Sequence, residues 1–330
     1  MVKLSALNLF PVFLQDQPID AIRRGRELAQ IVEKLGYDRY WIAEHHNSPG
    51  VISTATSVLI QYVLDATENI RVGAGGVMLP NHTPLQVAET YGMLDVLHPG
   101  RVDLSLGRAP GTDTETAQLI YRGETSEEGF KDGIRALQRY FGPAESQESV
   151  IAVPAIDRQV PLYILGSTTT SAQIAAGLGL PYAFAGHFSP NFLEKAIEIY
   201  REQFVPSEYL QEPYLILAMI GTAQETTEKA EEMKSIWDFH SIQIARGESG
   251  QIQTPDISFY NHLTTVEKFF LKTRGGINLY GNPEEVANVW KDINTKYHPD
   301  EVMIVSYSPE IEQLEESYRI IKEVITTHSK

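Results

Sequence analysis

Short apolar runs alternate along the whole chain with segments whose apolar residues recur every three or four positions. The run 3–9 is typical of a buried strand, whereas Leu28 and Val32 recur at helical spacing in a predicted helix over 21–35. The same alternation predicts further strands at 39–43, 70–74, 101–106, 160–165, 182–185, 213–220 and 301–306. It predicts further helices at 54–67, 85–97, 127–141, 169–178, 190–204, 224–245 and 309–326, and another that begins at Asn282, a residue suited to the N-cap.

Eight strands, each followed by a helix, indicate an α/β fold with a parallel sheet. Over 330 residues this arrangement favours a (β/α)8 TIM barrel that forms one domain, 1–330. A doubly wound sheet would carry a glycine-rich fingerprint after its first strand. Here that strand ends in Asn8-Leu9-Phe10-Pro11, which favours the barrel.

A long insertion, 246–281, follows the seventh predicted strand. It contains Gly247, Gly250, Pro255, Gly275 and Gly276. Long loops in compact domains often cover active sites, so we expect a mobile lid. A decorative insertion or a dimer contact is the alternative.

Composition narrows the class of protein. Apolar residues make up 42% and charged residues 21% of the chain, as in globular proteins, and no run of about 18 apolar residues could span a membrane. The net charge of −16 disfavours nucleic acid as a partner, because an acidic protein repels phosphate backbones. The absence of cysteine excludes disulfides, cysteine–zinc sites and a thiol nucleophile. With no secretory pattern in residues 1–5, these features predict a cytoplasmic protein.

The carboxyl ends of barrel strands usually carry the active site. The second predicted strand ends in Glu44-His45-His46, where side-chain alternation places Glu44 and His46 on one side and His45 on the other. An imidazole at this place can act as a general acid or base, a hydrogen-bond donor or a metal ligand. A structural histidine pair is the alternative. The histidines that a metal site could recruit are His82, His98 and His187.

Two further strand ends suit a phosphate and a flat ring. Gly166-Ser167-Thr168-Thr169-Thr170 opens a helix whose free N–H groups and hydroxyls can bind an anion, and Arg108 ends the fourth strand. The alternative is an ordinary helix cap beside a surface arginine. Gly73-Ala74-Gly75-Gly76, after the third strand, allows close approach of a ligand to the backbone, or forms a simple turn.

Four motifs resemble those of the bacterial luciferase-like flavin monooxygenases. They are YWIAEHHN at 40–47, GGVMLPNH at 75–82, HPGRVDL at 98–104 and GRAPGTD at 107–113. The resemblance extends over nearly the whole chain and is strongest to a subgroup described only as luciferase-like oxidoreductases. Four long motifs in the right order are specific for the family, although they do not identify a substrate.

The resemblance implies a homodimeric barrel that binds FMN, and no metal, at the carboxyl ends of its strands. It implies catalytic residues at His45, Glu44 and His46, and a non-proline cis peptide bond between Gly75 and Gly76 that supports the flavin ring. The implied cofactor-binding residues are Gly75, Gly76, Gly107, Arg108, Gly166, Ser167 and Thr170, with Arg108, Ser167 and Thr170 at the phosphate. Luciferase has a cysteine where this chain has Gly107 and a glutamate where it has Gly166, which argues against light emission.

The implied activity is that of a two-component monooxygenase that acts on paired donors with incorporation of O2. A separate NAD(P)H-dependent flavin reductase would supply FMNH2, which forms a C4a-hydroperoxide with O2 and oxygenates a small organic substrate. Three alternatives stay open. They are hydride transfer with deazaflavin F420, a non-catalytic flavin-binding protein, and a zinc hydrolase that uses Glu44, His45 and His46.

Overall fold

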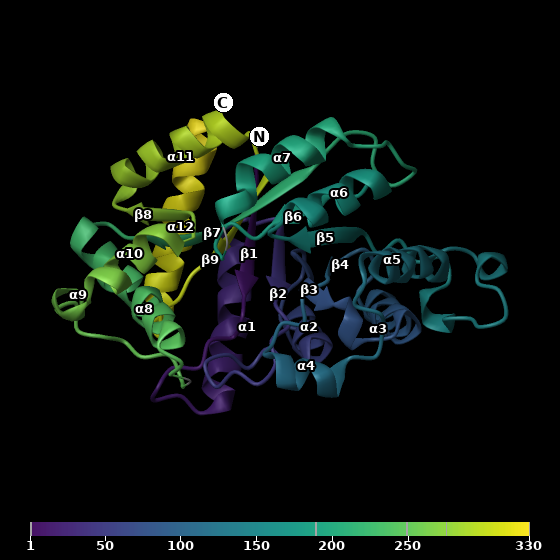
Figure 1. Cartoon of the computed structure of the whole chain (residues 1–330), viewed down its shortest axis with the longest axis horizontal. Helices are drawn as coiled ribbons and strands as arrows, with labels where there is room; N and C mark the ends of the chain where they lie inside the picture. Colours follow the sequence, from purple (N-terminus) through teal and green to yellow (C-terminus); the bar gives the residue numbers. More distant parts are fainter. Residues whose placement is uncertain (1, 189, 249, 275, 330) are drawn as a thin grey trace.

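Eight parallel strands close a barrel in the computed structural model, which describes residues 2–188, 190–248, 250–274 and 276–329 (Figure 1). The strands are β1 Lys3–Asn8, β2 Arg39–Ile42, β3 Arg71–Met78, β4 Val102–Gly107, β5 Leu162–Gly166, β6 Tyr182–Phe184, β7 Leu215–Ala223 and β9 Glu301–Val305. Each is paired with its neighbour in this order, and β9 closes the ring on β1. The predicted barrel is therefore confirmed.

Helices cover the outside of the barrel (Figure 1). The principal ones are α1 Pro18–Lys34, α2 Thr56–Leu64, α3 Pro84–Leu97, α5 Glu127–Phe141, α6 Thr169–Leu178, α7 Leu193–Glu202, α8 Thr227–Ala245, α11 Pro283–Tyr297 and α12 Ile311–His328. Asn282 caps α11 as predicted, because its Oδ1 accepts hydrogen bonds from the N–H groups of Glu284 and Glu285 at 3.0 and 3.1 Å.

Alternation along each strand separates two apolar layers. On β2, Tyr40 and Ile42 join the large core between the strands and the helices. Trp41 and the following Ala43 belong instead to a second cluster that fills the barrel interior. If this alternation continues beyond Ala43, the side chain of Glu44 points outward and that of His45 points inward. These two directions determine the geometry of the candidate site.

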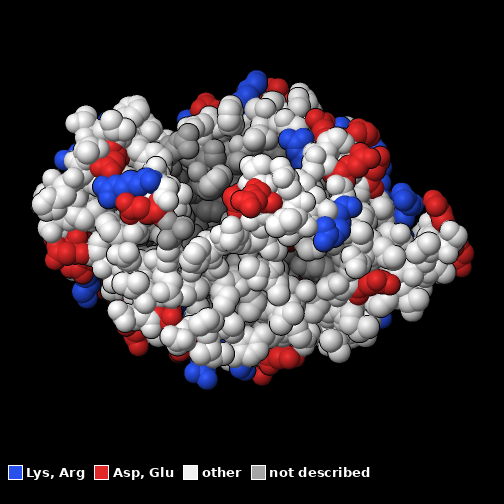
Figure 2. All heavy atoms as spheres, turned by 60° about the horizontal axis from the view of Figure 1, so that its bottom comes forward, with Lys and Arg blue, Asp and Glu red and all other residues white. Residues whose placement is uncertain are grey.

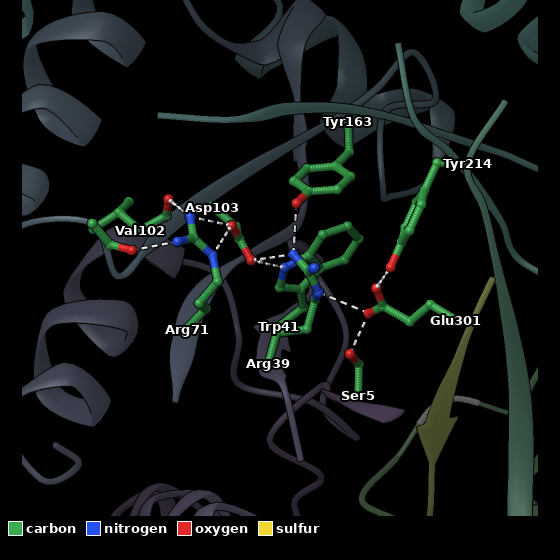
Figure 3. Close-up of polar contacts among 10 residues, drawn as sticks. Ser5, Arg39, Trp41, Arg71, Val102, Asp103, Tyr163, Tyr214 and Glu301 are labelled. Atoms are coloured by element: carbon green, nitrogen blue, oxygen red, sulfur yellow. Dashed lines mark hydrogen bonds and ion pairs between the residues drawn. The ribbon is translucent and has the colours of Figure 1, made fainter. Parts of the chain in front are cut away.

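A buried ion-pair network occupies the amino-terminal end of the barrel (Figure 3). Arg39 of β2 lies 2.7 Å from both Asp103 of β4 and Glu301 of β9. Arg71 of β3 pairs with the other oxygen of Asp103, also at 2.7 Å. Each carboxylate is fully buried, so pairing offsets the cost of removing its charge from water. This network closes the end of the barrel opposite the strand ends that carry the motifs.

Three parts of the chain differ from the sequence-based expectation. The insertion 246–281 holds α9 Phe259–His262, α10 Thr265–Arg274 and β8 Asn278–Gly281, an extra strand that pairs with β7 outside the ring. The residues after Gly111 form α4 Thr114–Ile120, which the apolar pattern does not predict. β3 extends beyond residue 74 because its glycines remain paired with β4.

Gly275, which the sequence analysis placed in the insertion, lies outside the described residues.

The surface mixes charges. On the face drawn in Figure 2, acidic and basic side chains are interspersed and large areas carry neither. Among the described residues, none of the helices combines the length and the apolar character that a membrane span needs.

Candidate active site

The Glu44-His45-His46 tripeptide divides between the two sides of the barrel wall. Glu44 lies outside, where it lines a cavity of about 130 Å³ with Val87 and Tyr91 of α3. His46 Nε2 lies 3.0 Å from Glu44 Oε1, on the same side. His45 takes the opposite, inward direction. The three residues therefore do not form one cluster, although the sequence places them together.

The Glu44 carboxylate is almost fully buried, at 2% exposure, and is surrounded by hydrogen-bond partners. Asn81 Nδ2 donates to it at 2.9 Å, His82 Nε2 lies 2.9 Å from Oε2, and the backbone N–H of Met78 donates at 3.1 Å. Burial raises the pKa of Glu44, but hydrogen bonds from His82, His46 and Asn81 outweigh it and hold the pKa below its usual value. Glu44 is therefore an ionised support for the end of β3.

The glycines of β3 form a tightly packed part of the wall. The peptide bond between Gly75 and Gly76 is cis, as the resemblance implies. A Cβ on Gly76 would lie 2.6 Å from the carbonyl oxygen of Ser105, and one on Gly75 would lie 2.8 Å from Trp41. Neighbouring strands alone thus require glycine here, and the resulting surface without side chains is one on which a flat ring fits.

The carboxyl ends of β4 and β5 offer a site for an anion. Thr168 caps α6, since its hydroxyl accepts a hydrogen bond from the N–H of Ser171 at 3.3 Å. Ser167 and Thr170 are half-buried, and no hydrogen bond engages their hydroxyls within the described part of the chain. Arg108 is half-buried on the adjacent strand end and has no ion pair among the described residues. A helix N-terminus, two hydroxyls and one guanidinium fit the phosphate of a flavin nucleotide.

Gly107 and Gly166, two of the implied cofactor-binding residues, lie close to neighbouring side chains. A Cβ on Gly107 would lie 2.9 Å from the Met78 sulfur, and one on Gly166 would lie 2.2 Å from the Ser171 hydroxyl. The contact with Ser171 leaves no room for a side chain at Gly166, whereas the flexible end of Met78 could move aside at Gly107.

Two of the sequence motifs contact one another directly. The N–H of His46 donates to the carbonyl of Gly111 at 3.1 Å, and the Thr112 hydroxyl donates to the carbonyl of His46 at 2.9 Å. Gly111 has φ +65°, and a Cβ there would lie 2.6 Å from the Glu44 carbonyl oxygen. The segment after β4 is therefore fixed against the end of β2.

Two inward-facing histidines lie at the end of the barrel that is formed by the carboxyl ends of the strands, here called the barrel mouth. The Nδ1 atoms of His45 and of His187, which follows β6, are buried and have no hydrogen-bond partner among the described residues. Burial, then the charge of His45, lowers the pKa of His187 to about 4. Burial also lowers the pKa of His45, against the opposing effect of Glu44. Both imidazoles are thus favoured in the uncharged form.

Comparison with known proteins shows the family of the chain. Residues 3–294 match the model of the luciferase-like monooxygenases. The chain belongs to this family. It is 40% identical over 322 residues to the uncharacterized protein YvbT of Bacillus subtilis, covering 97% of this chain and 96% of that protein. It is 36% identical over 304 residues to a luciferase-like monooxygenase of Escherichia coli, covering 92% and 91%. The crystal structure of apo-MsnO8 superposes with a TM-score of 0.91 at 27% identity, covering 99% of each chain.

Luciferase-like monooxygenases are flavin-dependent. The residues that the sequence predicts for the site can therefore be compared with what a flavin needs for binding. The structure brings Arg108, Ser167 and Thr170 to adjacent strand ends, and directs Glu44 and His46 away from the mouth. Within the described residues, no three His, Asp or Glu side chains are arranged to hold a metal ion. Sequence reasoning did not single out Asn81, or assign His82 and His187 to this site. The only signals were the position of Asn81 and His82 in the second motif and of His187 after a strand.

Proposed function

We propose that this protein is an FMN-dependent monooxygenase that receives reduced FMN from a separate NAD(P)H-dependent flavin reductase. The observation that carries the proposal is the half-buried Arg108, which directly follows β4 and has no ion pair among the described residues, while the paired strand β5 leads into the N-terminus of α6. Arg108 lies at the same barrel mouth as the uncharged His45, so an anionic flavin tail and a proton-handling group would share one site.

Each part of this site has a distinct role in the proposal. When bound, reduced FMN would supply the oxygen-transfer chemistry. Arg108, Ser167 and Thr170 hold the phosphate, and the Gly75–Gly76 wall supports the ring. His45 accepts or donates a proton at its Nδ1 atom. The apolar barrel interior excludes water below the reacting centre.

Glu44 and His46 act in this proposal as positioning residues. The Glu44 carboxylate holds the backbone of Met78, two residues beyond Gly76. His46 orients that carboxylate from the outer side of the wall. Neither side chain needs to touch the flavin to affect its binding.

Flavin titration tests the proposal. We expect the wild type to bind FMN more tightly than riboflavin, which has no phosphate, and Arg108→Gln to lose about tenfold or more in FMN affinity while riboflavin binding is unchanged. The exposed Arg135→Gln is the matched control. Preferential binding of F420 would favour hydride transfer, and equal binding of FMN and riboflavin would contradict the phosphate site.

Oxygen reactivity separates an enzyme from a carrier. FMNH2-loaded protein mixed anaerobically with oxygenated buffer in a stopped-flow instrument should reoxidise at a rate different from free FMNH2, with a transient absorbance. His45→Ala should abolish that difference, because the variant lacks the inward imidazole. Reoxidation of the wild type at the free-flavin rate would favour a non-catalytic flavin-binding protein.

We also propose a homodimer formed through α2 and α3. Val58 on α2 and Met93, Val96 and Leu97 on α3 are exposed apolar residues on helices that contact each other. Light scattering should give twice the chain mass, and Met93→Asp should give a monomer. Leu119→Asp, at an exposed site on α4, is the control.

The insertion 246–281 is proposed to close over the barrel mouth. Ile252 is anchored by backbone hydrogen bonds with Val12 and Leu14, at 2.8 and 2.9 Å, and Ile277 is anchored to Gly186 at 2.9 Å. Between these anchors, α9 and α10 leave apolar side chains such as Phe269 exposed. The backbone amides of α10 should therefore exchange more slowly with deuterium when FMN is bound than when the protein is free of flavin.

A further inference from the structure

His45 and His187 lie at the carboxyl ends of two strands on opposite sides of the barrel ring. They follow β2 and β6, which are four places apart in the eight-stranded ring. Each has a buried Nδ1 atom without a partner in the part of the chain that the structure describes. An unpaired buried polar atom costs free energy, and a catalytic role or a bound molecule is one explanation for such an atom in a native protein. Two of them at one mouth mark positions where a bound molecule would complete the hydrogen bonding.

The backbone, rather than the side chain, fixes His187 in place. The N–H of Ile277 donates to the carbonyl of Gly186 at 2.9 Å. Gly276 packs so closely that a Cβ on it would lie 2.0 Å from the carbonyl oxygen of His187. The backbone of His187 therefore has a defined position, and the Nδ1 atom of its side chain has no partner among the described residues.

The surroundings of His187 define its charge state and the chemistry of its ligand. His45 is the titratable group that acts on it, and neither Gly276 nor Ile277 has a titratable side chain. With its pKa lowered to about 4, His187 is uncharged at neutral pH and can donate or accept one hydrogen bond. The partly buried Leu165 and Trp237 pack against the interior cluster, so apolar side chains lie below this end of the barrel.

We propose that His187 is a second substrate-contacting residue, which hydrogen-bonds an uncharged polar atom of the substrate opposite His45. The ligand class is an organic molecule with an apolar body and one uncharged hydrogen-bonding group. This inference rests on the proposed function, because it takes the barrel mouth as the place where substrate meets flavin.

Histidine NMR tests the facing arrangement without any flavin. The Cε1–H resonance of His187, assigned by its loss in His187→Leu, should titrate near pH 4 in the wild type. In His45→Gln its pKa should rise, because a nearby positive charge is removed, but burial should still hold it below the ordinary value of about 6.5. His298→Asn, at an exposed left-handed position, is the control and should change nothing. An identical His187 pKa in the wild type and His45→Gln would overturn the arrangement.

Binding of simple alcohols tests the substrate contact. A series from 1-butanol to 1-decanol is titrated into the flavin-free protein, with the matching alkanes as probes that lack the polar group. We expect alcohols to shift the His187 resonance, and His187→Leu to bind them about tenfold more weakly than the wild type. His187→Asn, which keeps an amide near the Nδ1 position, should recover part of the affinity. Equal binding of an alcohol to the wild type and His187→Leu, or binding of no alcohol to the wild type, would overturn the proposal.

Failure of the proposed His187 contact can be told apart from failure of the proposed monooxygenase function. His187→Leu removes an unpartnered polar group, so its melting temperature should equal or exceed that of the wild type, whereas a structural role would lower it. FMN affinity is measured separately on the same variants. A wild type that binds alcohols through His187 but binds no FMN would contradict the monooxygenase proposal and leave the histidine contact established.

Discussion

The carboxylate of Glu44 accepts a hydrogen bond from the backbone N–H of Met78, 3.1 Å away, and so joins the end of β2 to the end of β3. Met78 follows the Gly75–Gly76 wall by two residues. The acid in the tripeptide therefore supports the proposed ring site from behind, and the adjacent His45 faces the mouth. One motif thus supplies a positioning residue and a site-facing residue through the simple alternation of a strand.

Replacing Glu44 with Gln should weaken FMN binding. Glu44 accepts from Met78 through one oxygen and from Asn81 through the other. The amide keeps only one acceptor oxygen, and its NH2 group cannot accept a hydrogen bond, so one of these buried donors loses its partner. We expect about a tenfold loss of FMN affinity and roughly 1–3 kcal/mol of stability, measured by fluorescence titration and urea unfolding. Glu315→Gln, on the exposed face of α12, is the matched control. Unchanged affinity in Glu44→Gln would show that the end of β3 does not depend on this carboxylate.

Glu44 should also contribute to the loss of stability in acid. Its folded-state pKa lies below the ordinary value of 4.5, so the unfolded state binds a proton first as the pH falls. The stability that it contributes is complete above about pH 4.5 and is lost as the pH falls through the folded-state pKa. Urea unfolding at pH 6 and pH 3 should therefore show a smaller acid effect in Glu44→Gln than in the wild type. An equal effect in the two proteins would contradict the lowered pKa.

Gly276→Ala should disturb the mouth more than a glycine substitution elsewhere in the insertion. A Cβ at 276 would lie 2.0 Å from the backbone of His187, which cannot move without the end of β6, whereas a Cβ at Gly250 meets nothing within 4 Å. We expect Gly276→Ala to lower the melting temperature and to shift the His187 NMR resonance. Gly250→Ala should leave both unchanged, and the same response in the two variants would refute a specific contact.

The sequence predicts the barrel well because each strand and helix has its own local pattern. The helices 127–141 and 169–178 have the observed bounds, and Asn282 caps α11 as expected. The short β8 has no such pattern, since its pairing with β7 depends on a partner far along the chain. The candidate site is only partly predictable for the same reason. Spacing brings Glu44 and His46 together, but the bonds of Glu44 to Asn81 and His82 arise from tertiary packing.

Arg39→Met should be among the most destabilising single substitutions at the amino-terminal end of the barrel. Among the described residues, it leaves the fully buried Glu301 with the hydroxyls of Ser5 and Tyr214 as its remaining side-chain partners. Asp103, in contrast, retains Arg71 (Figure 3). Removing one member of a buried ion pair costs about 3–5 kcal/mol, because the other charge stays buried without compensation. Urea unfolding should show a loss of this size.

Two comparison variants separate charge burial from loss of contact at Arg39. Arg319→Met breaks exposed ion pairs with Glu225 and Glu323 and should cost less than about 1 kcal/mol. Arg39→Met combined with Glu301→Gln should be more stable than Arg39→Met alone, since a neutral amide can still accept from Tyr214 without a buried charge. If the double variant were as unstable as the sum of the single ones, the loss would come from packing around Trp41 and Tyr163 instead of from the stranded carboxylate.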